Sequence, residues 1–260
     1  MELSLKDKRA LICGSSSGIG LASAVELSKL GAECVLLARD EERLQHALQQ
    51  LEGEEQHSYL LADFNMPEQV ETAVHSFLQR KGPVHILVNN TGGPAGGPVL
   101  EAAPEAFINA CQQHLICNQL LARAVVPGMR NAGYGRIINI ISISVKAPIP
   151  NLGVSNTARW AVAAWAKTLA GEVAGDGITV NNVLPGSTLT GRLRSLLEAR
   201  VAQRKATKED ILKEWLADIP MGRFGEASEI ANLVAFLASP AASYITGTSI
   251  QVDGGKTPVM

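Results

Sequence analysis

Short apolar segments alternate with longer segments of helical periodicity along most of the chain. The apolar segments have the length of buried strands, and those between them, such as 19–30, 41–51 and 67–80, repeat apolar residues at helical spacing. Because strand–helix–strand repeats form parallel sheets with right-handed crossovers, we predict a doubly wound α/β fold of about seven strands with helices on both faces. The predicted strands are Ala10–Cys13, Cys34–Ala38, Tyr59–Ala62, Ile86–Asn89, Arg136–Ile141, Thr179–Leu184 and Ser249–Val252.

Length and composition favour a single domain, 1–260, around one large core. The chain has 260 residues, 46% of them hydrophobic and 18% charged, and a formal net charge of −2. This balance offers no basic surface for nucleic acid or an anionic membrane, so we expect small-molecule partners. No apolar run reaches membrane-spanning length, and the first strand follows the N-terminal methionine closely. We therefore expect no signal peptide and a cytoplasmic location.

One long segment, 190–223, departs from the strand–helix rhythm. It is charged and favours helix, particularly over Arg194–Lys205. A lid over a binding site and an ordinary surface excursion both fit this pattern.

The cysteines give no indication of a metal site. The chain has four, and they form neither a C-x-x-C pair nor a cluster with metal-ligand spacing. Cys13 and Cys34 fall within predicted strands, so we expect buried, reduced thiols.

A glycine-rich turn follows the first strand directly and leads into the first helix. It reads Gly14-Ser15-Ser16-Ser17-Gly18-Ile19-Gly20. Such a turn lets the backbone approach a pyrophosphate closely, and the helix N-terminus adds free N–H groups and a positive dipole end. Position and spacing together predict a dinucleotide-binding, Rossmann-type domain.

Arg39 stands at the end of the second predicted strand, where dinucleotide-binding folds distinguish the two nicotinamide cofactors. An acidic residue there would bind the ribose 2′-hydroxyl, whereas a guanidinium matches a 2′-phosphate. We therefore expect NADP(H) to be favoured over NAD(H). A solvated surface arginine is the alternative.

Further motifs in order along the chain resemble the short-chain dehydrogenase/reductase family, particularly its 3-oxoacyl-acyl-carrier-protein reductases. They are Asp63, Asn89-Asn90-Thr91-Gly92, Pro185-Gly186 with Thr190, Tyr244-Ile245-Thr246-Gly247 and Val252-Asp253-Gly254-Gly255. The resemblance implies hydride transfer with a nicotinamide cofactor. It also implies a homotetramer joined through long central helices, of which 152–174 carries Trp160 and Trp165. The cofactor-binding residues it implies are Gly14, Ser16, Ser17, Gly18, Ile19, Gly20, Arg39, Asp63, Asn90, Gly92, Arg159, Pro185, Gly186 and Thr190.

The catalytic pattern of that family is only partly present. Ser142 matches the family's serine, with Ser144 as its nearest rival. Where the family's Tyr-x-x-x-Lys is expected, the chain reads Ser155-Asn156-Thr157-Ala158-Arg159, so both signature residues are replaced. A serine hydroxyl titrates too high to replace tyrosine as a proton donor, and a guanidinium does not shuttle protons. The guanidinium can still bind ribose hydroxyls or an oxyanion.

His114 occupies the position where the family has a fourth catalytic residue, an asparagine. Asn118 lies one helical turn later, so a shift of register would place it there instead. With a reference pKa near ~6.5, an imidazole at this position could supply the proton directly or through water. A helix histidine satisfied by packing is the alternative.

Two functions fit these observations. The first is an NADP(H)-dependent oxidoreductase that reduces a carbonyl or oxidises an alcohol, in which Ser142 and Arg159 polarise the substrate oxygen and His114 or water donates the proton. The second is a non-catalytic NADP(H)-binding sensor, scaffold or partner subunit that has lost the catalytic tyrosine and lysine.

Overall fold

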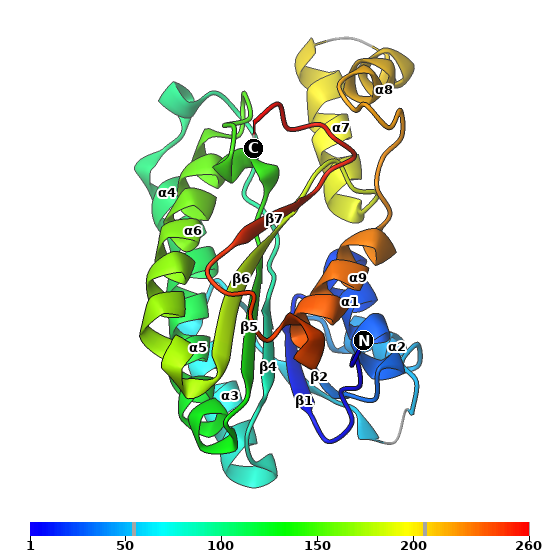
Figure 1. The fold of residues 1–260 in the computed structure, drawn as a ribbon. Helices are drawn as coiled ribbons and strands as arrows, with labels where there is room; N and C mark the ends of the chain where they lie inside the picture. Colours follow the sequence, from blue (N-terminus) through cyan, green and yellow to red (C-terminus); the bar gives the residue numbers. More distant parts are fainter. Residues whose placement is uncertain (54–55, 205–206, 260) are drawn as a thin grey trace.

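Seven parallel strands form one sheet in the computed structural model, which describes residues 1–53, 56–204 and 207–259. Their order is β3-β2-β1-β4-β5-β6-β7, which confirms the predicted doubly wound fold (Figure 1). The chain crosses from one half of the sheet to the other between β3 and β4, so the strand order reverses at β1 and β4, the point where open sheets of this kind typically bind ligands. The strands are β1 (Arg9–Cys13), β2 (Glu33–Ala38), β3 (Ser58–Leu61), β4 (Ile86–Asn89), β5 (Gly135–Ile140), β6 (Ile178–Pro185) and β7 (Ser249–Val252).

Helices cover both faces of the sheet (Figure 1). One layer contains α3, α5 and α6, and the other contains α1, α2 and α9. The α-helices are α1 (Gly18–Lys29), α2 (Glu41–Leu48), α3 (Pro67–Lys81), α4 (Pro104–Cys111), α5 (Cys117–Ala132), α6 (Gly153–Val173), α7 (Gly191–Arg204), α8 (Lys208–Ala217) and α9 (Ala227–Ala238).

Alternate residues of each central strand enter the two cores. Leu11 and Cys13 of β1 pack toward the layer with α3 and α5, whereas Ala10 and Ile12 pack toward α1 and α9. This follows from the two-residue period of a strand, and it explains why a strand buried on both faces has an uninterrupted apolar sequence. Cys13 and Cys34 are buried free thiols, as the sequence predicts.

Helix α2 ends earlier than its sequence pattern predicts. The pattern extends to Leu51, whereas the helix ends at Leu48. Gln50 and Leu51 instead donate backbone hydrogen bonds to residues three positions back, Ala47 and Leu48. Such tighter bonds satisfy carbonyls that a helix end leaves without partners.

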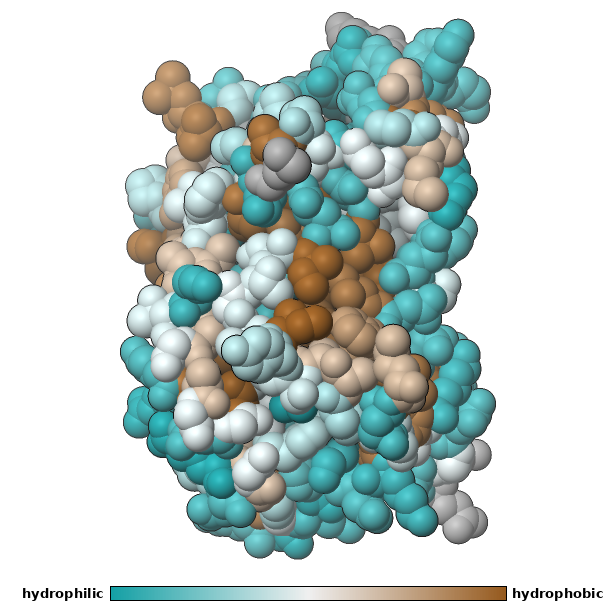
Figure 2. All heavy atoms as spheres, in the orientation of Figure 1, coloured by the Kyte–Doolittle hydropathy of each residue, from teal (hydrophilic) through white to brown (hydrophobic). Residues whose placement is uncertain are grey.

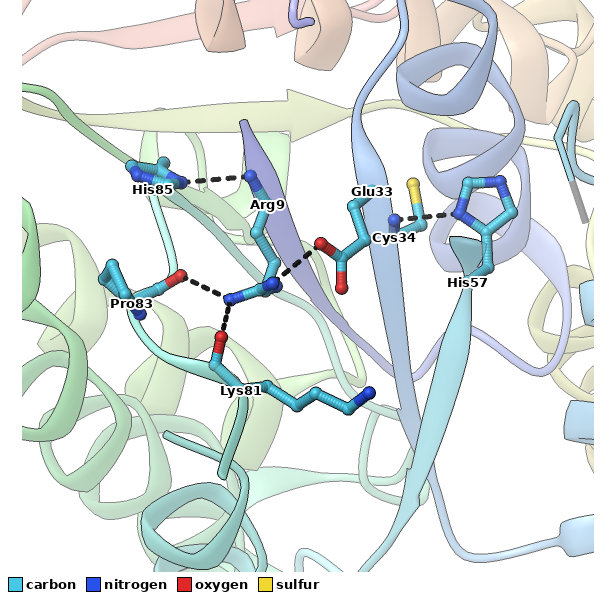
Figure 3. Close-up of polar contacts among 7 residues, drawn as sticks. All are labelled: Arg9, Glu33, Cys34, His57, Lys81, Pro83 and His85. Carbon is cyan, nitrogen blue, oxygen red and sulfur yellow. Dashed lines mark hydrogen bonds and ion pairs between the residues drawn. The ribbon is translucent and has the colours of Figure 1, made fainter. Parts of the chain in front are cut away.

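Polar side chains at the amino ends of the central strands serve the fold (Figure 3). The backbone N–H of Arg9 donates to Nδ1 of His85 at 3.0 Å, and that of Cys34 donates to Nδ1 of His57 at 3.0 Å. The Arg9 guanidinium pairs with Glu33 at 2.8 Å, which joins β1 to β2. These histidines act as backbone acceptors at the amino-terminal edge of the sheet.

Side-chain amides link four strands near the carboxyl edge. Asn89 donates to Asn139 at 2.8 Å, Asn139 to Asn182 at 2.9 Å, and Asn182 to Ser249 at 3.1 Å. The strand register aligns these residues on β4, β5, β6 and β7. Because buried polar groups need partners, this ladder fixes the relative positions of the strand ends that carry the site.

Helices α7 and α8 of the segment 190–223 stand beyond the carboxyl ends of the strands (Figure 1). Lys205, the end of the predicted helical run, lies outside the described residues. Figure 2 shows hydrophilic surface over this part of the molecule and apolar surface in the middle of the same face. Backbone hydrogen bonds connect the strand-like stretch before α7 to Gly225, so the segment is attached to the domain at both ends.

Candidate functional site

The glycine turn between β1 and α1 has a backbone that side chains would obstruct. Gly14 and Gly18 both have φ of +58°, in the left-handed region that favours glycine. A Cβ on Gly20 would lie 2.3 Å from the Gly14 carbonyl oxygen. The turn therefore brings the start of α1 closer to the end of β1 than any residue with a side chain would allow.

Asn90 fastens this turn to the end of β4. Its side-chain nitrogen donates to the carbonyl oxygens of Cys13 and Gly14, both at 3.2 Å. A Cβ on Gly14 would lie 2.7 Å from the Asn90 carbonyl oxygen, so the two segments are in direct backbone contact. Gly92, close by on the same loop, has no other atom within 4 Å of the position that a Cβ would occupy.

The N-terminus of α1 is free to receive an anion. Ser17 is the N-cap residue, and its side chain makes no capping hydrogen bond. Ser15 is fully buried, and its hydroxyl bridges the Ile12 carbonyl and the Leu37 amide, which makes it a structural residue of the turn. Ser16, Ser17 and Ile19 retain solvent exposure. Backbone N–H groups at such a terminus suit a phosphate.

Arg39 and Asp63 meet at the carboxyl ends of β2 and β3. Their side chains form a loose ion pair at 3.6 Å, in which the Arg39 side chain is 72% exposed. Hydrogen bonds from Asn65, assisted by Arg39, lower the pKa of Asp63 below its usual value. Arg39 thus presents a largely open guanidinium at the position that the sequence predicts for 2′-phosphate recognition.

The segment after β6 closes the other side of the glycine turn. Pro185 ends the strand, and Gly186 packs so tightly that a Cβ there would lie 2.7 Å from Cα of Asp253. Thr190 places its methyl group 3.4 Å from the Cβ position of Gly18. The turn, Arg39 and this segment together fit a dinucleotide: backbone donors for the pyrophosphate and a cation for a 2′-phosphate.

Arg159 is held at the carboxyl end of β5 by three groups. Its Nη1 donates to the carbonyl oxygens of Ile140 at 3.2 Å and Ile141 at 2.7 Å, and its Nε donates to the Ser155 hydroxyl at 3.2 Å. Burial and the neighbouring Arg192 lower the pKa of Arg159 to about 10, so it stays cationic at neutral pH. Ser155, itself buried, orients this guanidinium.

Ser142 ends the β5 segment beside this guanidinium. Its hydroxyl oxygen accepts a hydrogen bond from the Ser144 amide at 3.1 Å and so caps the short helix η4 (Ile143–Val145). This contact uses a lone pair, and within the described part of the chain the hydroxyl proton has no acceptor. Ser144, its rival in the sequence, is buried, and its hydroxyl has no partner among the described residues.

His114 lies in a π-helical turn, η3 (Gln112–Ile116), that the sequence did not predict. Its side chain is 4% exposed, and Nε2 has no hydrogen-bond partner among the described residues. Burial, with the charges of Arg159 and Arg192, lowers the pKa of His114 to about 3. Desolvation and the two guanidiniums disfavour the imidazolium, so the pKa of His114 lies well below the reference value of a free imidazole.

Arg192 is the residue of this site that the sequence analysis missed. It follows Thr190 by two positions at the start of α7 and donates from Nη2 to the Pro94 carbonyl at 2.5 Å. Burial lowers its pKa below the usual value. Its spacing from the Pro-Gly-x-x-x-Thr segment is the only sequence signal, and the fold is needed to bring α7 against the loop 92–98.

Within residues 1–53, 56–204 and 207–259, no group of three or more His, Cys, Asp or Glu side chains is arranged to hold a metal ion. Within the same ranges, none of the helices combines the length and apolar character required to cross a membrane.

Comparisons with known proteins agree with this geometry. A family profile described as Enoyl-(Acyl carrier protein) reductase matches residues 14–257. The 3-oxoacyl-(acyl-carrier-protein) reductase of Vibrio cholerae is 36% identical over 97% of this chain and 98% of its own length.

Solved structures give the same result. The L-sorbose reductase of Gluconobacter frateurii, complexed with NADPH and L-sorbose, is 35% identical with a TM-score of 0.92, covering 100% of both chains. An actinorhodin polyketide ketoreductase with NADPH is 32% identical with a TM-score of 0.89, covering 96% of this chain and 97% of its own. The chain therefore belongs to the short-chain dehydrogenase/reductase family.

Proposed function

We propose that this protein is an NADP(H)-dependent oxidoreductase that transfers a hydride between the nicotinamide and a carbonyl or alcohol substrate. The observation that carries the proposal is the tightly packed glycine turn with the uncapped N-terminus of α1, beside a polar strand edge that presents Ser142 and Arg159. NADPH is present in the structures of the sorbose reductase and the polyketide ketoreductase. The segment 190–223 forms the wall on the substrate side in this proposal.

The cofactor supplies the hydride chemistry, and the protein residues manage the charge on the substrate oxygen. Ser142 donates its free hydroxyl proton to that oxygen as a hydrogen bond. Arg159 stabilises the developing negative charge, because its guanidinium is already oriented by Ser155 and two backbone carbonyls. The neutral His114 does not supply a proton as imidazolium at neutral pH, so water protonates the alkoxide.

Slow turnover should reveal the missing proton relay. We expect the purified protein to oxidise NADPH with aldehydes or ketones at a rate limited by protonation. The Ser155→Tyr/Arg159→Lys double variant should be faster by roughly 10²-fold, since general acid catalysis contributes about 10²–10⁴-fold. Stopped-flow absorbance of the cofactor against a carbonyl panel measures both.

Ser155→Phe/Arg159→Lys is the matched control, because it differs from the first double variant by one hydroxyl group. Equal rates for the two variants, both folded by thermal melting, would show that protonation does not limit turnover. Tight NADPH binding without oxidation in the unmodified protein would instead favour the non-catalytic binding protein.

Arg39 should determine cofactor choice. Arg39→Ala removes the guanidinium that we assign to the 2′-phosphate, so the Kd for NADPH should rise about 10- to 100-fold while that for NADH changes little. Fluorescence titration of the two cofactors measures this ratio. Arg43→Ala is the control, because Arg43 is similarly exposed nearby but pairs with Asp40; an equal loss in both variants would contradict the assignment.

The depressed pKa of His114 predicts the pH dependence of both activity and stability. The folded-state pKa of about 3 lies below the unfolded value of ~6.5, so the unfolded chain takes up a proton at His114 before the folded protein does. The free energy of unfolding therefore has its full value above about pH 6.5 and decreases as the pH falls toward 3. Between about pH 7 and pH 5 the free energy of unfolding should decrease by roughly 2 kcal/mol because of His114. Urea unfolding of wild type and His114→Gln should show the shallower dependence in the variant, and NADPH oxidation should show no His114-dependent inflection near ~6.5. Identical pH slopes would overturn the assignment.

We also infer a homotetramer. Trp160 of α6 is 47% exposed and Ile116, next to α5, is 46% exposed, which leaves large apolar side chains on the surface of the two long helices. Trp165 is tied to Gln119 of α5 at 2.7 Å, so these helices already form a joined face. Light scattering should give about four times the chain mass of 27.5 kDa. A monodisperse monomer would exclude the tetramer.

A further inference from the structure

The guanidinium of Arg192 crosses from α7 to the loop 92–98 on the opposite wall of the site. Its central carbon, Nε and Nη2 all lie 3.1 Å from the Cβ position of Gly93, so the planar group lies against this glycine. Its hydrogen bond to Pro94 fixes Nη2. Leu196, on the same helix, approaches the Cβ position of Gly96 at 3.8 Å, so α7 follows the loop.

The charges of Arg192 and Arg159 both influence the ionisation of His114. Both charges disfavour the protonated form of His114, and Arg192 also disfavours the charged form of Arg159. No acidic side chain contributes to the shifts of these three groups, and none of the described ion pairs includes either arginine. The described part of the chain thus leaves two partly buried positive charges without a counter-ion.

Two like charges in a partly desolvated site destabilise the protein unless something offsets them. Backbone carbonyls orient both guanidiniums but do not neutralise them. A guanidinium has a planar set of donors that matches a carboxylate, and it is less strongly hydrated than an ammonium group. The pair is therefore suited to an anion that enters from outside.

We propose that Arg192, together with Arg159, binds a carboxylate of the substrate, so that the substrate class is an oxo acid or the corresponding hydroxy acid. This inference rests on the proposed oxidoreductase function and specifies its substrate. The unpartnered, buried Nε2 of His114 adds a polar atom to the same region.

The cofactor pyrophosphate is the other anion that could meet Arg192. The position of the side chain favours the substrate. Thr190 contacts Gly18 of the glycine turn, whereas Arg192 contacts Gly93 and acts on His114, toward the strand edge that carries Ser142 and Arg159. The uncapped N-terminus of α1 already offers backbone donors for the pyrophosphate.

The test compares acids with their amides on the holoprotein. Acetate, phenylacetate and hexanoate, each beside its primary amide, are titrated calorimetrically into protein saturated with NADP⁺. At least one acid should bind about tenfold or more tightly than its amide. Arg192→Gln should weaken that acid about 10- to 100-fold and leave the amide within about threefold, as expected for a charged hydrogen bond.

Two further variants separate charge from position. Arg194→Gln removes the same charge from an exposed site on α7 and should retain the acid preference. Gly93→Ala keeps Arg192 but introduces a methyl group against its guanidinium, so it should reduce the preference without changing the net charge.

Three outcomes would overturn the inference. The first is the absence of any acid preference in the wild type. The second is an equal loss of acid and amide binding in Arg192→Gln, which indicates a structural role. The third is a loss of NADPH affinity in that variant with the acid preference intact, which assigns Arg192 to the pyrophosphate. An acid preference in a protein that never oxidises NADPH would refute the proposed reaction but not the anion site.

Discussion

The close packing of Gly20 on Gly14 and Asn90 is the constraint on which the site depends. Cβ positions on Gly20 and Gly14 would overlap the Gly14 carbonyl at 2.3 Å and the Asn90 backbone at 2.7 Å. The end of β1, the start of α1 and the end of β4 therefore meet with no space for a methyl group. This contact places the uncapped N-terminus of α1 at the point where the strand order reverses, beside the ends of β1 and β4.

Polar side chains of the protein itself line the carboxyl edge of the sheet. The ladder from Asn89 to Ser249 satisfies buried amides across four strands, and it ends in an Asn89 oxygen that has no partner among the described residues. Beside it, Arg159 occupies the last carbonyls of the β5 segment. Because these groups are fixed by one another, the proposed reaction would need little reorganisation of their dipoles when charge develops on a substrate.

The sequence predicted the sheet well, because strands buried on both faces have uninterrupted apolar runs; β4 and β7 have the predicted bounds, and the other strands differ by about one residue at their ends. The glycine turn was equally predictable from the sequence, since a left-handed backbone and a close approach of two segments both require glycine. The ionisation of His114 and the position of Arg192 were not predictable from the sequence. The low pKa of His114 arises from burial and from two arginines distant in sequence, and Arg192 reaches the site only because α7 packs on the loop 92–98. Such effects depend on tertiary contacts that no local pattern encodes.

In the proposed oxidoreductase, Ser155 and Arg159 stand where the family resemblance implies a tyrosine and a lysine, which changes the kind of catalytic help the site can give. A lysine beside a tyrosine favours proton transfer, because both groups can titrate toward working pH. Arg159 stays cationic, and Ser155 accepts a hydrogen bond that holds the guanidinium in place. In the proposed reaction the pair therefore provides an oriented positive charge where a proton relay would otherwise act. Arg192 adds a second such charge without an acidic partner in the described structure. A site built in this way would stabilise negative charge more readily than it moves protons. The proposed anionic substrate and the proposed protonation by water therefore follow from the same arrangement of charges.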